Sequence, residues 1–371
     1  MILKTNKNAT FRWMSRTESQ DVSGEITRVQ VELSTFCNMS CRACVRSSIR
    51  DFAPRHLTTA TAKKIAASLA GLPSLETIVL LGFGEPLCNP SFKKILAGFT
   101  ALNKRMTLVS NGALMDASTA DFLFSIPLSE LYLSWDDDIT GTDPLRNREG
   151  LAAQVFRERL SGICDARNRA GGRTALGIEI VATSANLDRL HETIAFGRDL
   201  GVESFIVSNM YPYSEQSVRI ILYGKGKKLQ KKAGKIFDSL RRHPGVTAAG
   251  VRMDAPRACP FIERGTVFIS SSGDVSPCPE LAYTHDAFNP HRRTHNALRF
   301  GNVARRSLGS IWSCEEFAAF RKDFEYYEFP DCSDCTSPEA CWHRNMDEED
   351  CYGNRTPCGE CLWAKGIIVC P

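Results

Sequence analysis

Three cysteines in one short segment are the residues of this chain best suited to chemistry. Cys37, Cys41 and Cys44 follow one another at the spacing C-x3-C-x2-C. An iron–sulfur cube normally takes four protein ligands, most often cysteine thiolates. A segment that offers three leaves one iron open to a ligand that is not protein. The spacing therefore predicts chemistry at an open iron rather than electron storage.

The alternatives for these cysteines are buried structural thiols, or a zinc site that takes its remaining ligand from elsewhere in the chain. Cysteine is often buried for packing alone. Three cysteines between positions 37 and 44 are nevertheless an unusual density for that role. A metal-cluster site is the stronger prediction from this segment.

A second concentration of cysteines lies toward the carboxyl end of the chain. Of the 15 cysteines in the sequence, nine of those from position 259 onward are candidate metal ligands: Cys259, Cys278, Cys332, Cys335, Cys341, Cys351, Cys358, Cys361 and Cys370. A zinc ribbon is the simpler alternative, since C-x2-C pairs are common zinc ligands. Nine thiols exceed one tetrahedral site, and two four-ligand sites would use eight. The isolated Cys88, Cys164 and Cys314 are interpreted as structural.

Composition limits the class of protein. The 371 residues suit two domains, and 43% apolar with 24% charged residues is ordinary for a globular protein. A net charge of +4 does not indicate a nucleic-acid partner. Residues 1–19 lack the apolar stretch of a secretory leader, and no apolar run is long enough to span a membrane. We expect a cytoplasmic chain whose thiols stay reduced and bind metal.

The elements that would position these cysteines alternate along the first two thirds of the chain. Strands are predicted at 26–33, 77–81, 106–109, 130–134, 176–183 and 204–207, and helices at 58–72, 91–102, 117–124, 150–168 and 187–200. Such alternation indicates a parallel sheet with right-handed crossovers, either most of a barrel or an open doubly wound sheet. The lysine-rich stretch 223–235 is interpreted as a solvated helix face or linker.

The alternation stops near residue 240, where we place a domain boundary. The expected parts are an N-terminal extension over 1–24, an α/β domain over 25–240 and a cysteine-rich domain over 241–371. A further strand is expected at 266–270.

Polar or glycine-rich groups follow several predicted strands. The cysteine segment follows the first strand, Gly82-Phe83-Gly84-Glu85-Pro86 the second, Ser110-Asn111-Gly112 the third, and Ser134 and Asp136 the fourth. Ligands of parallel α/β folds bind at the carboxyl ends of the strands. Glycines let a ligand approach the backbone closely, and Glu85 is suited to accept from an ammonium group. These groups therefore predict one pocket.

Together, and in this order, these motifs resemble the radical S-adenosylmethionine (SAM) superfamily over residues 25–215. The resemblance implies a partial (β/α)6, TIM-like barrel in which Cys37, Cys41 and Cys44 hold a [4Fe–4S] cluster and SAM occupies its open iron. It implies that Gly82, Phe83, Gly84 and Glu85 bind the methionyl amine of SAM. It also implies that the carboxylate or ribose of SAM is contacted by Ser110, Asn111, Ser134 and Asp136. Ala43 departs from the aromatic residue usual before the third cysteine.

The activity that this resemblance implies is reductive cleavage of SAM. An electron supplied by a reductant such as ferredoxin or flavodoxin enters the cluster, and a 5′-deoxyadenosyl radical forms and abstracts a hydrogen from the substrate. The protein would supply position and exclusion of water.

The carboxyl-terminal cysteines resemble the SPASM extension of radical SAM maturases, which carries auxiliary [4Fe–4S] clusters. The matching patterns are C-x13-G-x4-C from Cys259 to Cys278, then C-x2-C-x5-C from Cys332 to Cys341. By this resemblance Cys351 joins the first pair, and Cys361 joins the triplet. The usual cysteine three residues after the triplet is replaced by Asn345, so Cys358 and Cys370 remain alternatives for the last ligands.

The segment from Cys351 to Ala364, with Cys41-Arg42-Ala43-Cys44-Val45-Arg46, resembles the SPASM subgroup associated with tungsten-containing aldehyde oxidoreductases. That subgroup is thought to mature the oxidoreductase or its tungsten–pterin cofactor. We therefore expect a protein substrate or a cofactor-carrying enzyme as the partner, and neither nucleic acid nor membrane.

Two other functions are weighed against this one. A SPASM enzyme that modifies peptides or sulfatases would need a base near the barrel mouth, for which Asp137, Asp138 and Glu179 are candidates. An iron–sulfur electron carrier or zinc scaffold without catalysis is the third hypothesis. The open iron predicted at the first cysteine segment argues against it.

Overall fold

The computed structural model describes residues 24–371 except 43, 51, 137–152, 225, 289–291, 333–334, 336–340 and 342–348. Outside the described residues thus lie Asp137, Asp138, Ala43, Asn345 and residues 1–23 of the expected N-terminal extension over 1–24.

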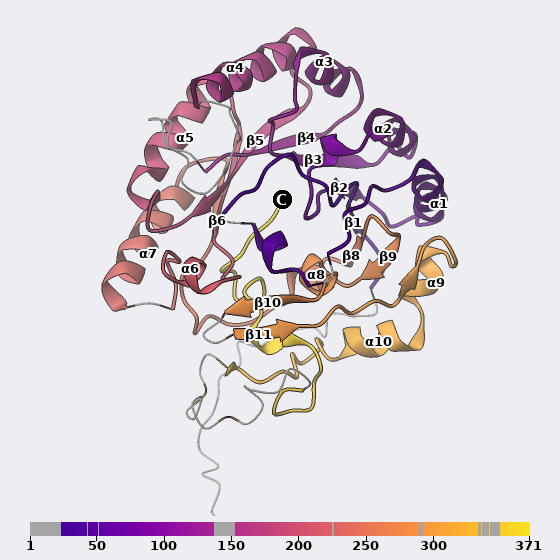
Figure 1. Cartoon of the computed structure of the whole chain (residues 1–371), viewed down its shortest axis with the longest axis vertical. Coiled ribbons are helices and arrows are strands. Elements are labelled where there is room, and N and C mark those ends of the chain that lie inside the picture. The colour runs from indigo at the N-terminus through magenta and orange to yellow at the C-terminus, as the bar shows by residue number, and fades with distance from the viewer. Residues whose placement is uncertain are drawn as a thin grey trace, which may run out of the picture.

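One curved sheet organises the molecule. Its strand order is β12-β9-β8-β1-β2-β3-β4-β5-β6-β7 among the described residues. The first six strands along the chain are β1 (Arg28–Val31), β2 (Thr77–Leu80), β3 (Arg105–Ser110), β4 (Glu130–Ser134), β5 (Ala175–Ala182) and β6 (Ser204–Asn209). They pair in parallel in sequence order. Figure 1 shows the sheet curving around the centre of the molecule, which is a partial TIM-like barrel.

Helices join these strands and cover the outside of the sheet (Figure 1). They are α1 (Thr59–Ala70), α2 (Phe92–Thr100), α3 (Ala117–Ser125), α4 (Ala153–Arg169) and α5 (Leu190–Asp199). Apolar side chains such as Val29 and Val31 on β1 belong to the main core, whereas the intervening Gln30 points to the inner side. Thr58 caps the amino end of helix α1, and its hydroxyl accepts from Thr61 N at 3.1 Å.

The six predicted strands are confirmed, and their ends differ from the prediction by at most two residues. The predicted helices are present as well, with 187–200 divided into a short 3-10 turn, Leu187–Arg189, and α5. The lysine-rich stretch leads into helix α7 (Lys227–Arg241), and a four-residue helix, α6 (Glu215–Val218), precedes it.

Residues after 240 extend both edges of the sheet. Strand β7 (Val246–Ala248) pairs with β6, while β8 (Thr266–Ile269) pairs in parallel with β1. Strands β9 (Asp274–Ser276) and β12 (Gly301–Asn302) continue from β8 in antiparallel pairing. The sheet therefore crosses residue 240, and the domain boundary expected there stays a prediction.

The remaining elements form a layer below the barrel in Figure 1. A separate hairpin joins β10 (His285–Phe288) and β11 (Arg292–His295). The helices are α8 (Pro260–Glu263), α9 (Leu308–Trp312) and α10 (Glu315–Lys322), with a 3-10 turn at Pro357–Glu360. Figure 1 marks the carboxyl end of the chain inside the curve of the sheet.

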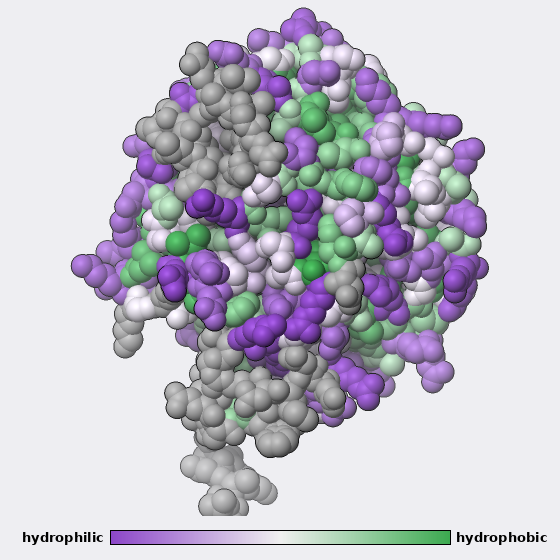
Figure 2. Space-filling model, viewed as in Figure 1, coloured by the Kyte–Doolittle hydropathy of each residue, from purple (hydrophilic) through white to green (hydrophobic). Residues whose placement is uncertain are grey.

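The outer surface is mixed in character. Figure 2 shows hydrophilic residues over most of one face, with apolar residues gathered near α2 and α3. Among the described residues, no helix is both long enough and apolar enough to cross a membrane.

Candidate functional site

The three cysteines of the first segment line one cavity. Cys37, Cys41 and Cys44 are partly buried and share a cavity of about 450 Å³. Its other lining residues are Thr35, Phe36, Ser40, Arg46, Ser47, Phe52 and Pro54. The segment follows β1, so the structure brings the three thiols together at the carboxyl end of that strand, as expected.

Polar and aromatic contacts fix the conformation of this segment, and its cysteines form no disulfide. The Arg46 guanidinium donates to Met39 O at 2.9 Å and to Thr35 O at 3.4 Å. The Phe36 ring stacks on His56, with centroids 4.4 Å apart. Burial raises the pKa of the Cys37 thiol. The loop is thus held by its own polar contacts, and no disulfide joins its three thiols.

The Gly-Phe-Gly-Glu turn packs directly on the cysteine segment. A Cβ atom on Gly84 would lie 2.3 Å from Ser34 O and 2.5 Å from Phe36 O, so only glycine fits between these carbonyls. The next residue, Glu85, donates its N–H to Phe36 O at 2.7 Å. Gly84 is therefore required by the close approach of two backbone segments.

The carboxylate of Glu85 connects the ends of β2 and β3. It is 2% exposed and accepts from Ser110 Oγ and from Asn111 N, both at 2.8 Å. Leu87 N donates to it as well, at 3.1 Å. Burial raises the pKa of the Glu85 carboxyl. These bonds engage both oxygens of the carboxylate, and the role of Glu85 as an acceptor for an ammonium group stays a prediction.

Asn111 reaches the cysteine segment from the end of β3. Its Nδ2 lies 3.6 Å from Cys37 Sγ and 3.0 Å from Asn38 Oδ1, and donates to both. This amide thus contacts a cysteine of the first segment.

Ser134 and Asp136 are buried at the end of β4. Asp136 Oδ1 accepts from Val181 N at 2.6 Å, and Asn186 Nδ2 donates to Asp136 O at 3.1 Å. These bonds connect β4 to the end of β5. Contact of Ser134 or Asp136 with SAM stays a prediction.

A buried glutamate, Glu32, lies beside Gly82 and Phe83, and the sequence patterns did not predict it as part of the site. Glu32 accepts from Phe83 N at 2.9 Å, from Ser271 N at 3.1 Å and from the Tyr283 hydroxyl. Burial raises the pKa of the Glu32 carboxyl. Glu32 alternates with Val31 and Leu33 in the predicted strand 26–33, but its partners come from distant segments that the periodicity of one strand does not reveal.

Four thiols, of which Cys358 is buried and the other three are partly buried, form a second group. Cys259, Cys278, Cys358 and Cys361 line one enclosed pocket with the apolar side chains of Phe261, Ile262, Leu281, Phe320 and Phe324. Burial raises the pKa of the Cys259 thiol to about 11 and that of Cys361 to about 12. The expected partner of Cys259 and Cys278 was Cys351; the structure places Cys358 and Cys361 beside them instead.

A third group lies nearer the surface. Burial raises the pKa of the Cys351 thiol, and Asp350, Cys341 and Cys335 raise it further. Burial also raises the pKa of Cys332 to about 12, with a contribution from Cys351. Cys335 and Cys351 are exposed. Cys351 thus lies near Cys335 and Cys341 of the C-x2-C-x5-C triplet, whereas Cys361 lines the pocket of Cys259 and Cys278.

Cys370 lies apart from both groups. Trp363 Nε1 donates to its sulfur at 3.3 Å. Burial raises the pKa of the Cys370 thiol to about 12, Glu179 of β5 raises it further, and Arg28 of β1 lowers it. These neighbours place Cys370 on the inner side of the sheet. Cys164 is buried in α4, and Cys314 precedes α10, consistent with structural roles.

Comparison with known proteins accounts for the barrel and the thiol groups. The model of the Radical SAM superfamily matches residues 31–169. The SPASM model, described as an iron–sulfur cluster-binding domain, matches residues 259–336. The chain therefore contains a radical SAM domain and an SPASM domain, which imply [4Fe–4S] clusters and SAM as its cofactors.

One relative is similar along nearly the whole chain. It is the tungsten-containing aldehyde ferredoxin oxidoreductase cofactor-modifying protein of Pyrococcus furiosus, 26% identical over 343 residues, 92% of this chain and 96% of that protein. Two solved structures share the fold. AdoMet-bound anSMEcpe gives a TM-score of 0.59 at 16% identity, covering 86% of this chain and 88% of that one. SuiB of Streptococcus suis bound to S-adenosylmethionine gives 0.58 at 17%, covering 85% and 72%.

Proposed function

We propose that this enzyme is a maturase that cleaves SAM reductively and modifies a protein or its bound cofactor, with a tungsten–pterin oxidoreductase as the target. The observation that carries the SAM-cleaving part is the meeting of Cys37, Cys41 and Cys44 in one cavity. Three thiols with space beside them fit a cluster that keeps one iron for SAM.

The bound cluster and SAM would supply the reactive chemistry, namely one-electron cleavage of the sulfonium to give a 5′-deoxyadenosyl radical. The chain's own residues would hold the cluster and orient the groups around it. Arg46 and Gly84 fix the path of the cysteine segment, and Asn111 donates to the sulfur of Cys37. The backbone of Gly82 to Glu85 is our candidate for the methionyl amine, and Ser134 and Asp136 are candidates for the carboxylate or ribose.

Two further clusters are assigned to the carboxyl-terminal thiols. Cys259, Cys278, Cys358 and Cys361 would hold the buried one, because four thiols crowded in an apolar pocket are stable as thiolates only with a metal between them. Cys332, Cys335, Cys341 and Cys351 would hold the other. We keep residues 25–240 as the radical SAM domain and 241–371 as the SPASM domain.

The proposed target rests on the relative from Pyrococcus furiosus, which this chain matches over 92% of its own length. A reductant such as ferredoxin or flavodoxin would deliver the electron. The peptide- or sulfatase-modifying alternative is supported by likeness of fold to SuiB and anSMEcpe, at 17% and 16% identity.

The cleavage reaction is tested with anaerobically reconstituted protein, dithionite and SAM. We expect 5′-deoxyadenosine and about twelve irons per chain, for three cubane clusters. Changing Cys37, Cys41 and Cys44 together to Ala should abolish the product and leave about eight irons. If protein with its full iron content forms no 5′-deoxyadenosine, the proposed SAM-cleaving activity is wrong.

The target is tested by adding candidate substrates to the same assay. We expect a tungsten-containing aldehyde oxidoreductase that carries its cofactor to increase 5′-deoxyadenosine formation above the basal rate. Its cofactor-free form and a precursor peptide serve as controls. Stimulation by the peptide alone would favour the alternative function.

A further inference from the structure

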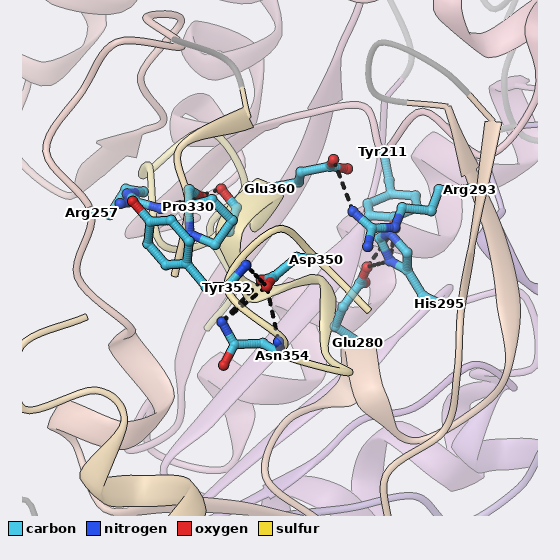
Figure 3. A network of polar contacts seen from close by, with 11 residues as sticks. Tyr211, Arg257, Glu280, Arg293, His295, Pro330, Asp350, Tyr352, Asn354 and Glu360 are labelled. Carbon is cyan, nitrogen blue, oxygen red and sulfur yellow. Dashed lines mark hydrogen bonds and ion pairs between the residues drawn. The ribbon is translucent and has the colours of Figure 1, made fainter. Parts of the chain in front are cut away.

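Three buried polar side chains and a partly buried tyrosine, none of which the proposed function uses, lie together beside the pocket of Cys259 and Cys278. Tyr211 follows β6, and Glu280 lies in a 3-10 turn, Pro279–Leu281. His285 begins β10 and His295 ends β11. Glu280, His285 and His295 are 8%, 1% and 7% exposed. Figure 3 shows Tyr211, Glu280 and His295 pointing toward one another from three separate segments.

The atoms of this group are spaced as ligands around one point. Glu280 Oε1 lies 2.6 Å from His295 Nδ1 and 3.4 Å from His285 Nε2. The Tyr211 hydroxyl oxygen lies 2.5 Å from Glu280 Oε1, 3.1 Å from His285 Nε2 and 3.3 Å from His295 Nδ1. Ligands bound at about 2.0–2.2 Å from one zinc-like ion stand roughly 3–3.5 Å apart. The spacing thus suits a shared ion after small adjustments.

The backbone fixes the orientation of the two histidines. His285 and His295 are direct partners in the β10–β11 register, with ring centroids 5.2 Å apart. His285 Nδ1 lies 2.9 Å from Tyr283 O, so a proton on Nδ1 leaves the lone pair of Nε2 directed at Glu280. Histidines that bind metal characteristically donate their second nitrogen to a carbonyl or carboxylate in this way.

The charge of the group also favours a cation. A buried carboxylate needs positive charge close by, and a divalent ion between Glu280 and two neutral imidazoles provides it. The competing interpretation is a metal-free ion pair in which His285 is protonated against Glu280.

We infer that Glu280, His285 and His295, with the Tyr211 hydroxyl at a fourth position, bind one divalent transition-metal ion of the zinc or ferrous type. Two imidazoles and a carboxylate are ligands for both ions, and no thiolate takes part. Glu280 also lines the pocket of Cys259 and Cys278, while Ile49, shortly after Cys44, bridges to His285. The ion would brace the hairpin between the first cysteine segment and the buried thiols.

The metal is identified on holoprotein with its clusters assembled, by elemental analysis and X-ray absorption at the zinc edge. After addition of zinc we expect about one zinc per chain with a nitrogen and oxygen shell near 2.0–2.1 Å, and no sulfur shell near 2.3 Å. In protein grown with ⁵⁷Fe and no zinc, Mössbauer spectra should show a mononuclear ferrous component beside the cubane signals. Absence of both metals, or zinc bound by sulfur only, would overturn the proposal.

The ligands are identified by His285→Gln combined with His295→Gln. Zinc retained through gel filtration should fall at least about tenfold, in line with the loss of ligand geometry. The matched control is Asp286→Asn on the same hairpin, whose carboxylate binds Arg50 and Arg292 near the surface; it should keep its zinc. A double variant that keeps full zinc would contradict the assignment. If that variant fails to assemble its clusters, the wild-type absorption spectrum still decides.

Discussion

At the scale of single residues, polar groups at strand ends serve different purposes despite similar positions. Glu85 and Ser110 bond to each other and hold β2 against β3. Asn111, next in sequence, turns its amide to Cys37 Sγ. The residue types alone suggested a common ligand pocket, but their burial and partners divide them into scaffold and site.

Replacing Asn111 by Ala tests the site role. Hydrogen bonds to cluster sulfurs stabilise the reduced, more negative state. We therefore expect a lower reduction potential for the cluster at Cys37, measured by an EPR-monitored redox titration, and on the order of tenfold slower 5′-deoxyadenosine formation. Iron content should not change. Asn168→Ala, on the exposed face of α4, is the control; an unchanged potential in Asn111→Ala would contradict the role.

At the scale of elements, sequence periodicity predicted the strands and helices of the barrel well because each has a short-range pattern. The strand β1 alternates, and β2 is a buried apolar run between turn signals. The pairing of β1 with β8 joins Val29 to Val267 and has no local signal. The same limit applies to the thiols. Their spacing predicts that they are ligands, but long-range packing places Cys358 beside Cys259.

Because the turn after β2 packs closely on the cysteine segment, we expect that adding one methyl group at Gly84 strongly disturbs that segment. Gly84→Ala places Cβ against Ser34 O and Phe36 O, and the segment must move. Overpacking of this kind costs about 1–3 kcal/mol of stability. We expect loss of about four irons and of SAM cleavage, with the auxiliary clusters retained.

Gly98→Ala is the matched substitution for this experiment. Gly98 lies within α2, is exposed, and no atom lies within 4 Å of the added Cβ. Alanine there should stabilise the helix by about 0.5–1 kcal/mol. Normal iron and activity in Gly84→Ala would show that the turn does not support the cluster.

At the scale of the whole molecule, the two auxiliary thiol groups differ in their access to solvent. Cys259, Cys278, Cys358 and Cys361 lie in an enclosed apolar pocket, whereas Cys335 and Cys351 are exposed. The same fold thus combines one protected site with one open to small reagents. Exposed iron–sulfur sites are the more readily attacked by oxidants and chelators, so the difference has a kinetic consequence.

Iron release measures that consequence. In the variant with Cys37, Cys41 and Cys44 changed to Ala, about eight irons remain, and oxidation with ferricyanide in the presence of a chelator should release them in two phases of about four each. Cys351→Ser in this background should remove the fast phase, because it takes a ligand from the exposed group. Cys358→Ser should remove the slow phase instead, since its thiol is buried in the enclosed pocket. A single phase, or loss of the fast phase in Cys358→Ser, would mean that the eight thiols are divided differently between the two clusters.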